Sequence, residues 1–111
     1  MQDKLLISNK IKKTIIYIEK MLENYPHTEN ILKNRIIDKS YELLELTYKA
    51  NIYKESCYMK NIIVDIRMLE FYIKKSLDKK IINYRKYEVL GNHFLEINKM
   101  VNSWILNEKV K

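Results

Sequence analysis

Apolar residues recur at alternating spacings of three and four along most of this chain, which places them on one face of an α-helix. Residues 4–24, 29–51, 54–77 and 84–107 each show this periodicity. The first stripe comprises Ile7, Ile11, Ile15, Ile18 and Leu22. The last comprises Tyr87, Leu90, Phe94, Ile97, Val101 and Trp104. The pattern predicts four helices, each burying one side against its neighbours.

Residues 59–77 differ because they carry apolar residues on two opposite faces. One stripe faces the expected core and comprises Met59, Ile62, Ile66, Leu69 and Ile73. The stripe on the other side comprises Val64, Met68 and Phe71. A basic row repeats every seven residues and so stays nearly in line: Lys60, Arg67 and Lys74. A helix in a monomeric bundle normally has one apolar side and one wet side. The second stripe therefore predicts a second cover, either another helix or another subunit.

Residues 29–51 also have a wide apolar surface. One stripe comprises Leu32, Ile36, Leu43, Leu46 and Ala50. A second stripe lies beside it and comprises Ile37, Tyr41, Leu44 and Tyr48. Tyr41 and Tyr48 are expected to be packing residues, with Tyr87, whose hydroxyl groups reach the edge of the core.

The joints between the helices are short. Pro26 ends the first helix, because a proline disfavours the helical conformation of the residue before it. Thr28 is a suitable N-cap for the second helix, and Asn83 for the fourth. The 111 residues include one Gly and one Pro, which argues against an all-β fold. The sequence predicts one all-α domain over residues 1–111, an up-down-up-down four-helix bundle.

The net charge of +7 is unevenly distributed. Residues 54–86 hold nine Lys or Arg against four Asp or Glu, whereas residues 26–53 and 87–111 are balanced. Clustered cations of this kind attract polyanions, and the alternative is a merely solvated charged face. The candidate nucleic-acid-binding residues are Lys60, Arg67, Lys74, Lys75, Lys79, Lys80, Arg85 and Lys86. Four tyrosines are candidates to stack on unpaired bases: Tyr53, Tyr58, Tyr72 and Tyr84.

The residue types needed for catalysis or metal binding are scarce. One cysteine, Cys57, excludes an intrachain disulfide and a Cys-based zinc site, and it is expected to be partly buried. His93 and Glu96 reverse the Glu-x-x-His order of di-iron bundles and occur once. No carboxylate pair falls on an apolar face. The sequence predicts a non-enzymatic protein with no catalytic residues, no metal and no cofactor.

The location of the protein is expected to be cytoplasmic. No uninterrupted apolar run approaches the roughly 20 residues that a membrane span requires. The N-terminus lacks the pattern of a secretory signal peptide.

Several short motifs point to a known family. The fourth helix contains Tyr87-Glu88, Glu96-Ile97, Lys99-Met100-Val101 and Trp104-Ile105. The second segment contains Tyr25-Pro26, Ile36, Tyr41-Glu42-Leu43-Leu44-Glu45-Leu46 and Ala50-Asn51. Over about residues 12–106 the chain resembles the Avd family, the accessory variability determinants of diversity-generating retroelements.

This resemblance implies a four-helix bundle that assembles as a barrel-shaped homopentamer. It also implies binding to nucleic acid and to a reverse transcriptase that copies a template RNA, with mutations, into a variable gene region. The best-matched basic residues are Arg67, Lys74 and Lys75. Bundle proteins encoded by intervening sequences of 23S ribosomal RNA genes share much of the pattern and are the alternative. A plain structural or membrane-surface protein is a third possibility, although the first helix, with Lys10, Lys12 and Lys13, has too little Trp or Phe for anchoring at an interface.

Overall fold

A computed structural model of the protein describes the backbone of residues 2–110 and the side chains of residues 6–108. Over this range the chain forms four long helices and no strand. The elements are α1 (Gln2–Leu22), the 3-10 turn η1 (His27–Glu29), α2 (Asn30–Tyr53), α3 (Ser56–Asp78) and α4 (Tyr84–Val110). The expected helix boundaries differ from these by only a few residues.

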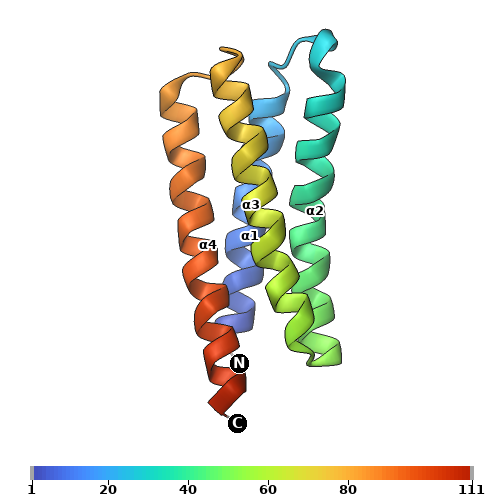
Figure 1. Ribbon diagram of the computed structural model, residues 1–111, viewed down its shortest axis with the longest axis vertical. Coiled ribbons are helices and arrows are strands. Elements are labelled where there is room, and N and C mark those ends of the chain that lie inside the picture. The colour runs from blue at the N-terminus through green and yellow to red at the C-terminus, as the bar shows by residue number, and fades with distance from the viewer. Residues whose placement is uncertain (1, 111) are drawn as a thin grey trace.

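Consecutive helices run antiparallel and lie side by side (Figure 1). α4 also packs against α1, whereas the backbones of the diagonal pairs α1–α3 and α2–α4 do not lie side by side over the described residues. The α1–α2 and α3–α4 joints share one end of the bundle, the loop end. Both termini and the α2–α3 joint share the other, the terminal end. The predicted up-down-up-down four-helix bundle is confirmed, and the number of subunits stays a prediction.

The core consists of the inward stripe of each helix. All five residues of the predicted α1 stripe are buried, as are the five of the α3 stripe that begins at Met59. Ile36 and Leu43 of α2 are fully buried, and Phe94 of α4 is among the largest fully buried side chains. Burying one such side chain stabilises the fold by about 1.5–3 kcal/mol relative to leaving it in water.

The second apolar stripe of α2 reaches the core only in part, because Ile37 and Leu44 pack against it and the two tyrosines do not. Tyr41 and Tyr48 are 49% and 44% exposed, and the Tyr41 hydroxyl donates a hydrogen bond to Glu19 of α1. The prediction that these two tyrosines are packing residues is wrong. α2 packs against α1 and α3, so the rest of its circumference faces solvent. Tyr87 does pack against the core. Cys57 is exposed, contrary to expectation, because it lies in the first turn of α3 beyond the core.

The first loop is tied to α3 by a buried tyrosine. α1 ends before Pro26 as predicted, and the Tyr25 hydroxyl donates to Ser76 Oγ at 2.8 Å. Ser76 Oγ in turn donates to the carbonyl of Tyr72 at 3.0 Å. Burial raises the pKa of Tyr25, so this donor keeps its proton. Thr28 does not cap α2, because η1 intervenes and Glu29 precedes the helix.

Two lysines in the left-handed conformation make the glycine-free joints. Lys54 has φ 59°, and its N–H donates to the carbonyl of Ala50 at 3.0 Å. Lys80 has φ 63°, and the N–H of the next residue, Ile81, donates to the carbonyl of Ser76 at 2.9 Å. Both arrangements satisfy carbonyls at a helix C-terminus in the way that glycine usually does. Asn83 caps α4 as predicted, because its Oδ1 accepts the Lys86 N–H at 2.9 Å.

Candidate nucleic-acid interface

The outer face of α3 carries the second apolar stripe where the sequence predicts it. Val64 and Phe71 are 58% and 57% exposed, and Met68 is half-buried. The opposite stripe of the same helix is the buried core stripe. α3 is therefore apolar on both sides, and the described residues leave most of its outer side uncovered.

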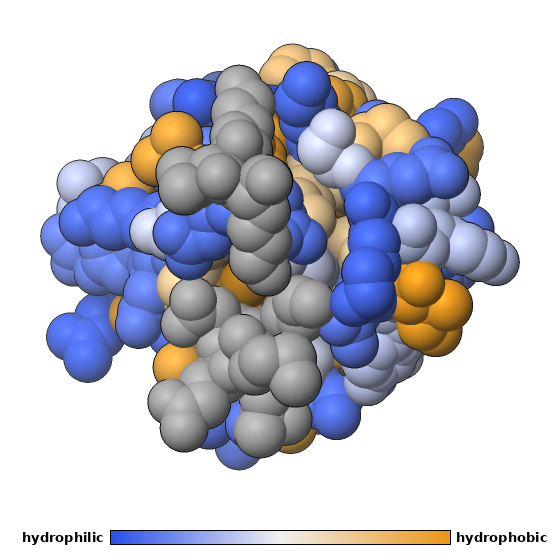
Figure 2. Space-filling model, turned by 90° about the horizontal axis from the view of Figure 1, so that it is seen from below, coloured by the Kyte–Doolittle hydropathy of each residue, from blue (hydrophilic) through white to orange (hydrophobic). Residues whose placement is uncertain are grey.

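Exposed apolar side chains also occur on the other helices. Ile16 of α1, Ile52 of α2 and Leu95 of α4 are each more than half exposed. Figure 2 shows the terminal end, where hydrophobic side chains appear at separate points of the rim between hydrophilic ones. Exposure alone therefore does not distinguish α3. What α3 adds is a row of three apolar positions on one face, Val64, Met68 and Phe71, with a row of exposed cations beside it.

The basic row of α3 lies in solvent beside this stripe. Lys60, Arg67 and Lys74 are exposed. Arg67 pairs with Glu70 at 3.2 Å, and Lys74 pairs with Asp78 at 2.7 Å. The hydrogen bond to Asp78 raises the pKa of Lys74, which stays charged. Exposed pairs within one helix are weak, because water and salt screen them, so a phosphate can displace the carboxylate.

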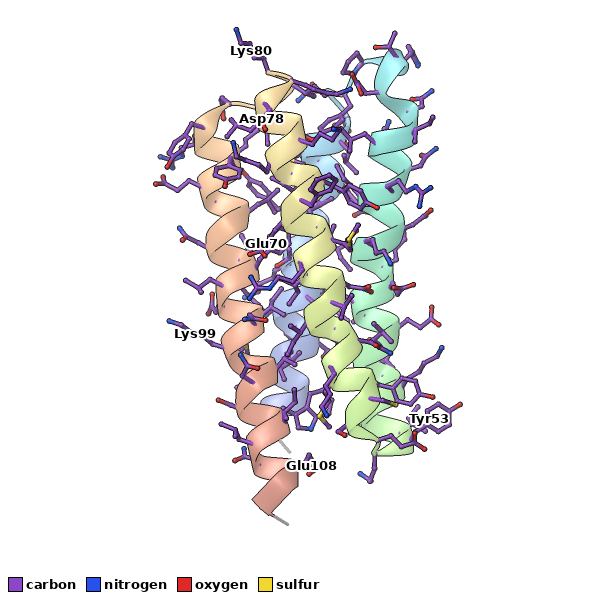
Figure 3. The ribbon with its side chains drawn as sticks, viewed as in Figure 1. Tyr53, Glu70, Asp78, Lys80, Lys99 and Glu108 are labelled. Carbon is purple, nitrogen blue, oxygen red and sulfur yellow. The ribbon has the colours of Figure 1, made fainter. Side chains whose placement is uncertain are left out.

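The cations of the loop end differ in how free they are. Lys79 is engaged by Glu29 of η1, with Nζ–Oε distances of 3.1 and 3.3 Å. Lys75 extends over the Phe71 ring at 5.8 Å from its centroid, and Lys80 points away from the bundle (Figure 3). Among the described side chains, no carboxylate pairs with Lys75, Lys80 or Arg85. These three are the most available for an anion.

Lys86 does not join the outer face of α3. It lines a hollow between α1 and α4 together with Lys20, which sequence analysis left out. An antiparallel bundle places the end of its first helix beside the start of its fourth, and that rule could have found the pair. The predicted basic set is therefore divided between two surfaces.

The four candidate stacking tyrosines are not gathered in one place. Tyr53 and Tyr58 contact each other, with ring centroids 5.5 Å apart, and Tyr53 lies at the opposite end of the bundle from Lys80 (Figure 3). Tyr72 is half-buried beside Phe71. Tyr84 is 63% exposed at the start of α4, next to Arg85. Tyr84 is the tyrosine best placed to meet a base bound at the loop end.

The seam between α2 and α3 encloses an acidic residue that the sequence did not mark. Asp65 of α3 is buried, and its Oδ1 accepts a hydrogen bond from Lys39 Nζ of α2 at 3.3 Å. Lys39 also reaches Glu42 at 3.3 Å. Burial and then Glu42 raise the pKa of Asp65 to about 7, while Lys39 acts in the opposite direction. This carboxylate pair comes from two helices, so a search for pairs on one apolar face could not detect it.

The seam between α1 and α4 encloses a neutral imidazole. Thr14 Oγ1 donates to the carbonyl of Lys10 at 2.9 Å, so the His93 Nδ1–H donates to Thr14 Oγ1 across 3.0 Å. Burial and then the charge of Lys10 lower the pKa of His93. Lys10 Nζ pairs with Glu96 at 2.9 Å. His93 and Glu96 are therefore both engaged in contacts with α1. In the described part of the chain, no three His, Cys, Asp or Glu side chains are grouped as metal ligands.

A family model described as bAvd-like matches residues 5–108. The chain belongs to the bAvd-like family. This match covers all four helices and confirms the resemblance to the Avd family. A comparison with curated proteins found no match. Within the described residues of this bAvd-like chain, no helix combines the length and apolar character that crossing a bilayer requires.

The basic positions that best match the Avd pattern fall together in this bAvd-like bundle. Arg67, Lys74 and Lys75 are all exposed on α3. They lie on both sides of Phe71 along the helix, so a partner that covers the apolar stripe also meets these charges. Trp104, which belongs to the same pattern, is a buried core residue of α4.

Proposed function

We propose that this protein is a non-catalytic accessory scaffold of a diversity-generating retroelement. In this role it binds nucleic acid, associates with the element's reverse transcriptase and assembles as a homopentamer in the cytoplasm. The observation that carries the proposal is membership of the bAvd-like family over nearly the whole chain. The partners and the subunit number come from the resemblance to the Avd family.

The charge distribution supports the nucleic-acid part of the proposal. Lys60, Lys75, Lys80 and Arg85 are exposed without a paired carboxylate in the described part of the chain. They extend from the outer face of α3 to the loop end. Several phosphates bound at such positions release counterions, which gives strong salt dependence and little sequence preference. Repeating the same surface around a ring of subunits adds the fields of the copies.

The exposed stripe of α3 supports the assembly part. Val64 and Phe71 expose more than half of their surface on an otherwise charged helix face. Covering them with another subunit removes that apolar area from water, which stabilises the assembly by roughly 25 cal/mol for each Å² buried. The flanking cations stay at the edge of such a contact, where they remain solvated.

The nucleic-acid part is tested by filter binding of a labelled single-stranded RNA at several salt concentrations. The variant replaces Lys60, Lys75, Lys80 and Arg85 with Gln. Its control replaces Lys12, Lys33, Lys99 and Arg35 with Gln, which removes the same residue types and the same net charge from other surfaces. We expect at least a tenfold loss of affinity in the first variant and a much smaller loss in the second. Equal losses in the two variants would contradict the proposed surface.

The retroelement part is tested by the genome and by co-purification. A reverse transcriptase gene beside this gene, and a complex of the two proteins that survives purification, are the expected results. A gene that lies inside a 23S ribosomal RNA gene, with no such enzyme nearby, would instead favour the intervening-sequence alternative.

A further inference from the structure

A hollow opens between α1 and α4 near the loop end. It has a volume of about 190 Å³ and is lined by Tyr17, Lys20, Met21, Asn24 and Lys86. The first four residues come from the end of α1 and the turn after it, and Lys86 comes from the first turns of α4. The two helix ends are held in place, since Tyr25 is anchored to Ser76 and Asn83 caps α4. The hollow is therefore a fixed feature of the bundle.

The hollow is positively charged and lacks an internal counterion. Among the described side chains no carboxylate pairs with Lys20 or with Lys86. Glu96, which lies further along the same seam, is taken up by Lys10 at 2.9 Å. His93 contributes no charge near neutral pH, because burial lowers its pKa. Two ammonium groups in one concave site repel each other, and an anion between them relieves that repulsion.

The remaining lining suits a phosphate ester better than a simple ion. Met21 and the Tyr17 ring give the hollow an apolar wall, and the Asn24 side chain adds an amide. The Tyr17 ring is backed by His93, with centroids 5.8 Å apart. The backbone N–H of Lys86 is already bound to Asn83 at 2.9 Å, so the charge for an anion comes from the ammonium groups. A sugar-phosphate unit combines the negative group and the apolar surface that these walls match.

We propose that this hollow seats one nucleotide of a bound single strand, with its phosphate between Lys20 and Lys86 and its sugar against Tyr17 and Met21. The assignment rests on the proposed nucleic-acid function, but the binding site in the hollow is distinct from the outer face of α3. The strand thereby follows the loop end from α3 over the start of α4 to α1.

The test compares two double variants in binding a fluorescein-labelled single-stranded oligonucleotide. Lys20→Gln with Lys86→Gln removes both ammonium groups of the hollow. Lys12→Gln with Lys99→Gln removes one exposed lysine from each of the same two helices, and Lys99 points away from the bundle (Figure 3). We expect the first variant to bind roughly tenfold more weakly and its salt slope to fall by about 0.7, the value for one lost phosphate on a single strand. Lys20→Arg with Lys86→Arg should retain most of the affinity.

A second measurement locates the site and separates the two proposals. Titration of the wild-type protein with uridine 5′-monophosphate should shift the backbone amide signals of Lys20, Asn24 and Lys86. If both double variants bind the oligonucleotide equally well, the hollow is not the seat, while the proposed function survives through the α3 face. If the wild type binds no oligonucleotide, the proposed function fails. The seat for a strand then fails with it, even if the monophosphate still shifts these signals.

Discussion

The α2–α3 seam and the α1–α4 seam each contain a titratable side chain between two packed helices, an acid in the first and a base in the second. Between α2 and α3 a buried carboxyl group, Asp65, is held by Lys39. Between α1 and α4 the imidazole of His93 is held by Thr14. The second seam also contains the basic hollow, whereas the first carries its charges as a compact cluster of Lys39, Glu42 and Asp65. One fold thus has one seam that favours a protonated acid and one that favours a neutral base.

The two seams respond to pH in opposite directions. The pKa of Asp65 is raised, so the folded chain keeps a proton that the unfolded chain releases, and stability falls as pH rises from about 4 to about 7. The pKa of His93 is lowered, so just below pH 6.5 the unfolded chain binds a proton at this residue while the folded chain keeps the imidazole neutral. Stability at that seam falls as pH drops below the ordinary His value of 6.5. The α2–α3 seam is therefore most stable at low pH, and the α1–α4 seam at a pH above 6.5.

The largest expected effect is at Asp65. Asp65→Asn removes the titrating group while keeping its size, so the free energy of unfolding of the variant should rise relative to wild type by up to about 1.4 kcal/mol for each pH unit between 5 and 6, and by less as the pH approaches 7. Urea unfolding at pH 5, 6, 7 and 8 measures this difference. Asp38→Asn, on the exposed side of α2, controls for the change in net charge. A difference between Asp65→Asn and wild type that stays constant with pH would show that Asp65 is not the titrating group.

The contact across the α1–α4 seam can be isolated with two threonines. Thr14 and Thr47 are both buried, and each donates to the carbonyl four residues earlier. Only Thr14 also accepts a hydrogen bond from another helix. Thr14→Val should therefore cost about 1–2 kcal/mol more than Thr47→Val at pH 8, because the His93 Nδ1–H loses its acceptor. Thermal unfolding of the two variants gives the comparison, and equal costs would rule out a stabilising Thr14–His93 bond.

The joint that leads into the α2–α3 seam should tolerate, and gain from, a glycine. Lys54 has φ 59°, a conformation that costs a residue with a Cβ about 1 kcal/mol or more. Lys54→Gly should raise the free energy of unfolding by about 1 kcal/mol, less the extra freedom that glycine gives the unfolded chain. Lys54→Ala keeps the Cβ and should show no such gain. A loss of stability in the glycine variant, measured by urea unfolding, would contradict the strain assigned to this joint.

The smallest expected effect is at Gly91 of α4. A Cβ added there meets no atom within 4 Å, although the residue borders a small hollow lined by Glu70, Ile73, Tyr87 and Phe94. Close helix packing is therefore not the reason for this glycine. Gly91→Ala should stabilise the protein by roughly 0.5–1 kcal/mol through helix propensity. A rise of the unfolding temperature is expected, and a fall would mean that the hollow must stay open.

The helices and their buried stripes could be predicted from the sequence because spacing of three and four is a local property. Met59 to Ile73 and Ile7 to Leu22 are buried as that spacing requires. Tyr41 and Tyr48 could not be placed, because two adjacent apolar stripes do not say which one meets a neighbour. Asp65 was missed for a related reason, since its partner Lys39 comes from another helix.

The candidate site was predicted less completely than the fold. The cations of α3 are exposed as expected, but their counterions depend on loop geometry, as the contact between Lys79 and Glu29 shows. Lys86 was grouped with the α3 cations, although the predicted antiparallel bundle already places the start of α4 beside the end of α1. The left-handed conformation of Lys54 and Lys80 could not be predicted from the sequence, because lysine rarely adopts it and glycine is the usual residue there.

The most direct test of the scaffold proposal is the mass of the wild-type protein in solution by light scattering. The proposal predicts about five times the chain mass of 13.6 kDa, and a smaller particle when Val64 and Phe71 are both replaced with Ser. Leu95→Ser, at an exposed apolar position of α4, should leave the mass unchanged. A wild-type protein that stays at 13.6 kDa over a wide range of concentrations would contradict the account.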